Sequence, residues 1–216
     1  MPPRRLAPSP REPRPTASAA RSSDSSASPS RAASAASPEA VRTALPAAGR
    51  RLHIGVIGEG VCSARVARDA ERVGAAIAGA GAVLVCGGLR GVMEAASRGA
   101  ARAGGTVVGL LPGFRAEDAN PWVTIPIVTG MDQARNVILV RSSDAIVAVG
   151  GLYGTLSEIA LALKFDTPVV GLRTWRLQPP TRRRVPLLTA ETAEQAAALA
   201  LRAARRRTGT PATWLP

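Results

Sequence analysis

The sequence predicts an α/β domain of the Rossmann-like, doubly wound class, with a mainly parallel sheet and helices on both of its faces. Short runs rich in Val and Ile alternate with Ala-rich stretches of helical period from about residue 51 onward. Aromatic residues make up only 3% of the chain, so aliphatic side chains must form the core, as they do where helices pack on β-branched strands. Strands and helices that alternate over short connections form parallel sheets covered on both faces.

The predicted elements follow one another in a regular order. The first two strands are the runs LHIGVIG and AVLVCG, and the later strands are apolar runs of similar length. The helices are the Ala-rich stretches between them, and a polar loop, GFRAEDANPW, separates two of the strands. In chain order we expect a strand at 52–58, a helix at 63–80, a strand at 82–87, a helix at 92–103, strands at 106–112 and 124–129, a helix at 132–141, a strand at 144–150, a helix at 155–165 and a strand at 168–172.

The charges divide the chain into three segments. Residues 1–50 hold 8 Arg and 3 acidic residues, residues 51–172 hold 11 basic and 10 acidic residues, and residues 173–216 hold 9 Arg and 2 acidic residues, which together give the net charge of +13. The basic ends can attract phosphate backbones non-specifically. The few aromatic residues do not interleave with the arginines, so a stacking surface for single-stranded nucleic acid is not indicated. We expect no nucleic-acid partner beyond such non-specific contacts.

The three segments are predicted to differ in structure. Residues 1–50 are rich in Pro, Ala, Ser and Arg and have no apolar face, so we expect a disordered tail. A true tail, an organellar transit peptide and a start site placed too far upstream all fit this composition. Residues 51–172 form the predicted Rossmann-like domain. Residues 173–216 form a basic extension with a terminal amphipathic helix that begins near Thr189 or Thr192.

Several classes of protein do not fit the sequence. No apolar run approaches the roughly 18 residues that span a bilayer, so we expect no membrane partner and a cytoplasmic protein unless the tail directs it to an organelle. Cys62, Cys86 and His53 do not have the spacing of a zinc site or of a disulfide framework, and we predict no metal site. The sequence also lacks a P-loop and a hydrolase GxSxG motif.

Three glycine-rich turns follow predicted strands. Ligands of open α/β sheets bind beyond the carboxyl ends of the strands, where glycines let backbone N–H groups approach an anion. The glycines also fit an interpretation in which they only permit tight turns. Two observations disfavour NAD as the ligand. Ser63 stands where the dinucleotide GxGxxG pattern has its last glycine, and the second predicted strand is followed by glycines instead of the acidic residue that binds the ribose. The candidate ligand- and phosphate-binding residues are Gly58, Glu59, Gly60, Gly87, Gly88, Gly91, Gly150, Gly151, Gly154 and Thr155.

The spacing of Thr155 and Glu158 has two interpretations. In the first, the two residues form a capping box, in which Thr155 accepts from a first-turn amide and Glu158 reaches back to the Thr155 N–H. In the second, the Glu158 carboxylate faces a developing positive charge, as in the oxocarbenium-like transition state of N-glycosidic cleavage. The residues alone leave both open.

Five segments together resemble a known superfamily. GVIGEG, VCGGLRGVMEAASRGA, GGTVVGLLPG, MDQARN and GGLYGTLSEIALALK occur in the order of the LONELY GUY- and DprA-related Rossmann proteins, whose members are often mislabelled lysine decarboxylases. The resemblance covers about residues 52–172. It is closest to a bacterial branch related to molybdenum-cofactor carrier proteins. LONELY GUY enzymes are cytokinin nucleoside 5′-monophosphate phosphoribohydrolases with a PGGxGTxxE signature.

The resemblance implies roles for individual residues. The glycine, threonine and glutamate of the signature fall on Gly154, Thr155 and Glu158, and the catalytic arginine falls on Arg135. This sequence departs from the signature in three places: Gly150 replaces Pro, Leu152 replaces the second Gly, and Asn136 replaces the Lys after the arginine.

Two functions follow as hypotheses. In the first, the protein binds a phosphorylated nucleotide-like or pterin ligand, with the molybdenum cofactor (molybdopterin) as the candidate. In the alternative, it is a nucleoside 5′-monophosphate phosphoribohydrolase, in which Glu158 and Arg135 are catalytic. The resemblance also implies a homo-oligomer.

Overall fold

The computed structural model describes residues 50–178 and 185–208. The expectation of a disordered tail therefore falls outside the described residues, apart from Arg50. The described residues form a seven-stranded parallel sheet flanked by helices, which confirms the predicted Rossmann-like class. None of the described helices is both long and apolar enough to cross a membrane.

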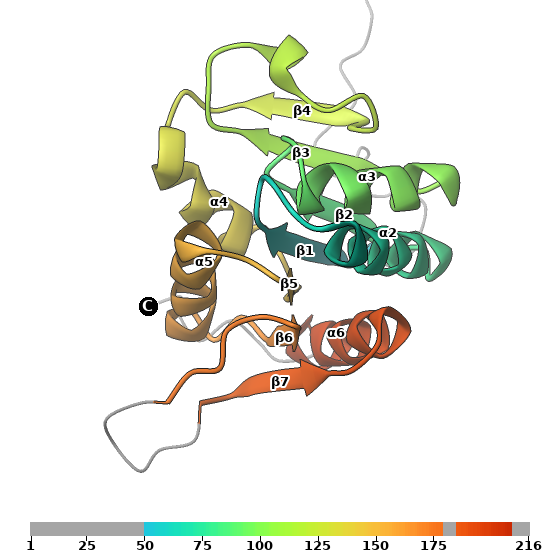
Figure 1. Ribbon diagram of the computed structural model, residues 1–216, viewed down its shortest axis with the longest axis vertical. Helices are drawn as coiled ribbons and strands as arrows, with labels where there is room; N and C mark the ends of the chain where they lie inside the picture. The colour runs from blue at the N-terminus through green and yellow to red at the C-terminus, as the bar shows by residue number, and fades with distance from the viewer. Residues whose placement is uncertain (1–49, 179–184, 209–216) are drawn as a thin grey trace, which may run out of the picture. The chain divides into compact units, whose positions relative to one another are not determined.

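The sheet has the strand order β4-β3-β2-β1-β5-β6-β7, and neighbouring strands are parallel throughout. In Figure 1 it runs from β4 at the top to β7 at the bottom. The direction of winding reverses between β1 and β5, which makes this pair the topological switch point. The strands are β1 (His53–Gly58), β2 (Val83–Cys86), β3 (Val107–Leu111), β4 (Ile125–Val128), β5 (Ala145–Val149), β6 (Val169–Leu172) and β7 (Leu187–Ala190).

The helices divide between the two faces of the sheet because right-handed crossovers change face when the winding direction changes. One face carries α2 (Ala64–Gly79), α3 (Val92–Arg102) and α6 (Ala193–Thr208), and the other carries α4 (Arg135–Arg141) and α5 (Tyr153–Lys164). Two short 3₁₀ helices, η1 (Ala116–Asp118) and η2 (Asp132–Ala134), lie in the connections on either side of β4.

The core follows the two faces of the sheet. Successive side chains of a strand point to opposite faces, so Ile54 and Val56 of β1 pack with α2 and α3, whereas Ile57 packs with α4 and α5. Helices α2 and α3 pack closely because they meet at glycines. A Cβ on Gly74 would collide with the Ala96 carbonyl, and one on Gly99 would collide with the Glu71 carbonyl.

The carboxyl-terminal segment differs from the prediction in two respects. Strand β7 was not predicted, because the sequence pattern indicated a terminal helix that begins near Thr189 or Thr192. The helix begins at Ala193, where the Thr192 hydroxyl accepts a hydrogen bond from Gln195 N at 3.2 Å, so Thr192 and not Thr189 caps it. Since β7 pairs with β6 and α6 packs against α2, these elements belong to the same sheet and core as the predicted domain.

Candidate functional site

A cavity of about 400 Å³ lies at the carboxyl ends of β1 and β5, where the strand order reverses. Open α/β sheets bind their ligands at this position. The cavity brings together residues from three of the predicted segments: the turn after β1, the turn after β2, and the first turns of α5, with α4 closing one side. Eight of the predicted site residues line it: Gly58, Glu59, Gly60, Gly87, Arg135, Gly154, Thr155 and Glu158.

The other four predicted glycines lie outside the lining and shape the turns. Gly88, Gly91, Gly150 and Gly151 all have positive φ, between 58° and 109°, which L-residues with a side chain rarely adopt. The Gly88 carbonyl accepts hydrogen bonds from the N–H and the side-chain amide of Asn120. In the structure these four glycines form tight turns, as the alternative interpretation of the glycine-rich segments predicted.

Arg135 and Glu158 form a buried pair in the cavity. Arg135 begins α4, Glu158 lies on α5, and less than 10% of either side chain is exposed. Arg135 Nη1 lies 3.5 Å from Glu158 Oε1, which is long for an ion pair. Burial raises the pKa of Glu158 from 4.5 to about 7, and the positive charge of Arg135 lowers it by less than burial raises it.

The capping-box interpretation of Thr155 and Glu158 is wrong. Helix α5 begins at Tyr153, with Leu152 as the N-cap and no side-chain capping hydrogen bond. Thr155 is therefore already inside the helix, and Glu158 lies one turn further on. The carboxylate is in reach of Arg135 and lines the cavity instead of closing the helix end.

Two polar atoms at this pair have no hydrogen-bond partner, one on Arg135 itself and one on the next residue. Arg135 Nε and Asn136 Oδ1 are both buried, and neither forms a hydrogen bond within the protein. Buried polar groups without partners are rare in native proteins, because the lost hydrogen bond to water costs about 1–3 kcal/mol each. Both residues line the cavity.

Asn136 was noted in the sequence only as a departure from the signature, and its place in the lining was not predicted. Gln133, Leu89 and Met93 line the cavity as well. The quoted segments MDQARN and VCGGLRGVMEAASRGA contain all four residues, so the signal was present in the motifs. Gly87 allows the close approach of these groups, since a Cβ there would lie 2.6 Å from Arg135 Nη2 and 2.7 Å from Met93 Sδ.

Within the described residues, the two cysteines do not belong to a cluster of potential metal ligands. Cys86 is fully buried beside Ser97, and burial raises the pKa of its thiol. Residues 50–178 and 185–208 contain no group of three or more His, Cys, Asp or Glu side chains that could hold a metal ion.

The raised pKa of Glu158 predicts how stability depends on pH. The folded-state pKa lies above the unfolded value, so the folded protein retains a proton that the unfolded chain releases between about pH 4.5 and 7. Glu158 therefore lowers stability as pH rises through this range, by about 3 kcal/mol in all. Glu158→Gln removes this dependence, so its stability relative to the wild type is expected to be greater at pH 8 than at pH 5. Urea unfolding gives the free energy of unfolding of both proteins at pH 5 and pH 8. If the difference in this free energy between the two proteins is the same at both pH values, the prediction is contradicted.

The fold and the cavity define a Rossmann-like α/β protein with a cavity at the topological switch point. A family model described as the SLOG cluster 4 family matches residues 51–204. The chain belongs to this family, which is part of the LONELY GUY- and DprA-like Rossmann superfamily, as the sequence resemblance predicted.

Solved structures and one sequence relative are similar to this chain. The molybdenum cofactor binding protein of the phototrophic bacterium Rippkaea orientalis is similar with a TM-score of 0.64 and 36% identity, over 70% of this chain and 96% of that one. The Moco carrier protein of Chlamydomonas reinhardtii gives a TM-score of 0.64 and 37% identity, over 73% and 99%. An uncharacterized protein of Archaeoglobus fulgidus is 52% identical over 130 residues, which are 60% of this chain and 82% of that protein.

DNA processing protein A (DprA) of Streptococcus pneumoniae is a more distant structural match. It has a TM-score of 0.53 and 15% identity, over 68% of this chain and 61% of that one. At this level of identity the similarity shows a shared fold.

Proposed function

We propose that the protein binds a phosphorylated pterin, with the molybdenum cofactor as the candidate ligand, in the cavity between β1 and α5. The observation that carries this proposal is Arg135, a buried cation that lines that cavity and whose contact with its ion-pair partner Glu158 is as long as 3.5 Å. Its guanidinium offers N–H donors to an anion, and the neighbouring Asn136 lines the same cavity. Two of the similar solved structures are described as proteins that bind or carry the molybdenum cofactor, which supports a ligand of this class.

The phosphate group is assigned to the end of the cavity formed by α4 and α5. Gly154 and Thr155 lie in the first turn of α5, where free backbone N–H groups and the helix dipole favour an anion. The guanidinium of Arg135 adds a planar charge that can bind a phosphate through two N–H groups. The phosphate would then compete with Glu158 for Arg135. Because Arg135 and Glu158 are 3.5 Å apart, the contact that the phosphate would replace is a long one.

The remainder of the cavity suits a flat heterocycle. Apolar residues, including Ile57, Leu89, Met93 and Leu152, line it next to the polar groups. A volume of about 400 Å³ lies in the range of small-molecule sites, which are mostly apolar with a few placed polar groups.

One observation favours a second function, hydrolysis of a nucleoside 5′-monophosphate. Glu158 is buried, lines the cavity and has a pKa near 7, as general acids and bases of enzymes do. The carboxylate would stabilise the cationic sugar or activate water while Arg135 orients the substrate. Incubation with the common nucleoside monophosphates and chromatography of free base tests this function, and Glu158→Gln should abolish any release that the wild type gives. If the wild type releases no base, hydrolysis of these substrates is refuted.

Direct titration tests the binding function. We expect the full chain to bind dihydroneopterin monophosphate, a simple phosphorylated pterin, at micromolar concentrations, with heat released in a calorimeter. Dihydroneopterin, which lacks the phosphate, should bind at least tenfold more weakly, because it forms no charge-assisted hydrogen bonds with Arg135. Equal affinities for the two compounds would contradict the phosphate site.

A further inference from the structure

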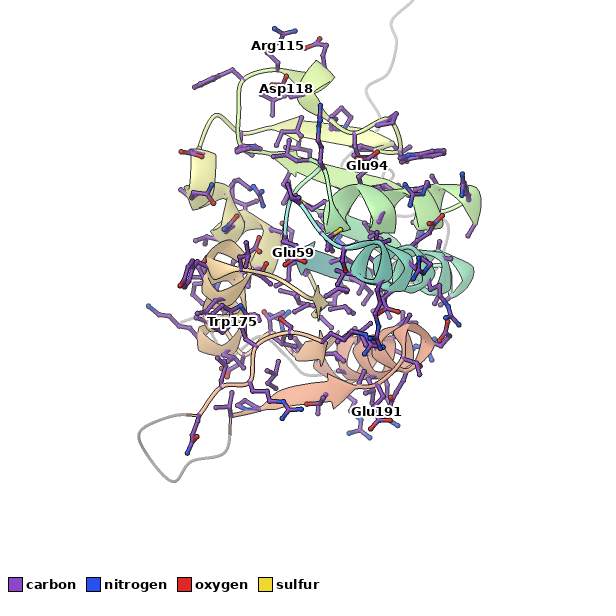
Figure 2. All side chains as sticks on the ribbon, in the orientation of Figure 1. Glu59, Glu94, Arg115, Asp118, Trp175 and Glu191 are labelled. Carbon is purple, nitrogen blue, oxygen red and sulfur yellow. The ribbon has the colours of Figure 1, made fainter. Side chains whose placement is uncertain are left out.

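Glu59 gives the cavity a second carboxylate, beside the turn that leads into α5. It follows directly after β1 and lines the cavity. Figure 2 shows it near the carboxyl end of β1. Its carboxylate is held in place by the backbone of the opposite turn, because Gly151 N donates a hydrogen bond to Glu59 Oε2 over 2.9 Å.

The glycines of that turn permit this arrangement. Gly150 and Gly151 have φ of 58° and 109°, which presents the Gly151 N–H toward β1. A Cβ on Gly150 would lie 3.2 Å from Glu59 Oε1, a crowded contact, so a glycine leaves the carboxylate its space. The Gly151 amide, predicted from the sequence as a phosphate donor, is therefore already engaged by a carboxylate of the protein.

The chemistry of a carboxylate decides which part of a ligand it can face. An ionised carboxylate only accepts hydrogen bonds, so a phosphate placed against it would meet repulsion and no donor. Its two oxygens offer about four acceptor positions, of which the Gly151 N–H occupies one. The remaining positions suit a ligand with two neighbouring N–H donors, which can bind a carboxylate side by side.

We propose that Glu59 is the specificity-determining residue of the cavity and selects rings that carry an amide N–H beside an exocyclic amino group. Guanine and pterins share this edge, whereas hypoxanthine lacks the amino group. This inference rests on the proposed function, in which the phosphate binds Arg135 and the ring extends along the apolar wall. Because the Gly151 N–H fixes the carboxylate before the ligand arrives, little further ordering is needed on binding.

Calorimetric titration of the full chain with four ligands tests the proposal. GMP and IMP differ only in the exocyclic amino group, dihydroneopterin monophosphate carries the same edge on a pterin, and ribose 5-phosphate has no ring edge. We expect the wild type to bind GMP or the pterin phosphate at least tenfold more tightly than IMP. Glu59→Gln should remove most of this preference and leave the affinity for ribose 5-phosphate unchanged. If only GMP loses affinity in the Glu59→Gln variant, the residue recognises guanine; if only the pterin phosphate does, it recognises a pterin.

Glu117→Gln is the matched control, since Glu117 is exposed on η1 and does not line the cavity. It should change none of the four affinities. Equal binding of GMP, IMP and the pterin phosphate by the wild type overturns the inference alone, and so does a Glu59→Gln variant that binds every phosphate more tightly. No binding of any of the four overturns the proposed function as well. If Glu59→Gln does not fold, the preferences of the wild type decide.

Discussion

Replacing Arg135 with alanine is expected to lower the affinity for a phosphorylated ligand about 1000-fold. Arg135 is the buried cation of the cavity, and its Nε lacks a partner inside the protein. Removing one member of a buried, hydrogen-bonded charge pair costs about 2–5 kcal/mol, because the partner charge is left uncompensated. The loss should appear in a calorimetric titration with dihydroneopterin monophosphate.

A second readout separates this role from a structural one. Arg135 lowers the pKa of Glu158 against the effect of burial, so its removal should raise that pKa further above 7. Arg141→Ala is the matched control, because Arg141 ends the same helix, is exposed and stacks over the Phe165 ring away from the cavity. An Arg135→Ala variant that folds and binds the ligand as the wild type does would refute the assignment of the phosphate.

Gly154→Val is expected to lower the same affinity about 100-fold with little effect on folding. Gly154 lies in the first turn of α5 and lines the cavity, and a Cβ there meets no atom within 4 Å. The added isopropyl group therefore enters the space assigned to the phosphate, and the loss of the close approach to the N–H groups corresponds to about 3 kcal/mol. Helix propensity should change little, because glycine and valine are both poor helix formers.

Gly79→Val is the control for this substitution. Gly79 ends α2, also has open space at its Cβ, and does not line the cavity. Both variants should melt within a few degrees of the wild type, but only Gly154→Val should lose the ligand. Unchanged affinity of Gly154→Val would place the phosphate elsewhere.

Most of the fold could be predicted from the sequence because the local signals agree with the architecture. The β-branched runs at 52–58 and 144–150 became β1 and β5, the central pair of the sheet, and the Ala-rich stretches became helices that differ from the predictions by a few residues at their ends. Strand β7 was missed for a physical reason. It has four residues at the edge of the sheet, three of them not fully buried, and its sequence LLTA has no alternation that distinguishes it from a helix start.

The position of the candidate site could be predicted from the sequence, but its internal contacts could not. Glycine-rich turns at strand ends and the superfamily motifs were enough to bring Arg135, Thr155 and Glu158 to one cavity. Whether Glu158 caps its helix or lines the cavity depends on where α5 begins. The helix was predicted to begin at residue 155, but it begins at Tyr153, so Glu158 lies beyond the capping position. The contact of Glu59 with the Gly151 amide joins positions 92 residues apart, so no local pattern could indicate it.

Mass spectrometry of the small molecules released from the protein tests the central claim most directly. The full chain is purified without added ligand from cells that make the molybdenum cofactor, and the compounds freed by denaturation are compared between the wild type and Arg135→Ala. The cavity between β1 and α5 predicts a phosphorylated pterin in near-stoichiometric amount with the wild type and at most traces with the variant. A wild type that releases no phosphorylated pterin, or a variant that releases as much as the wild type, would contradict it.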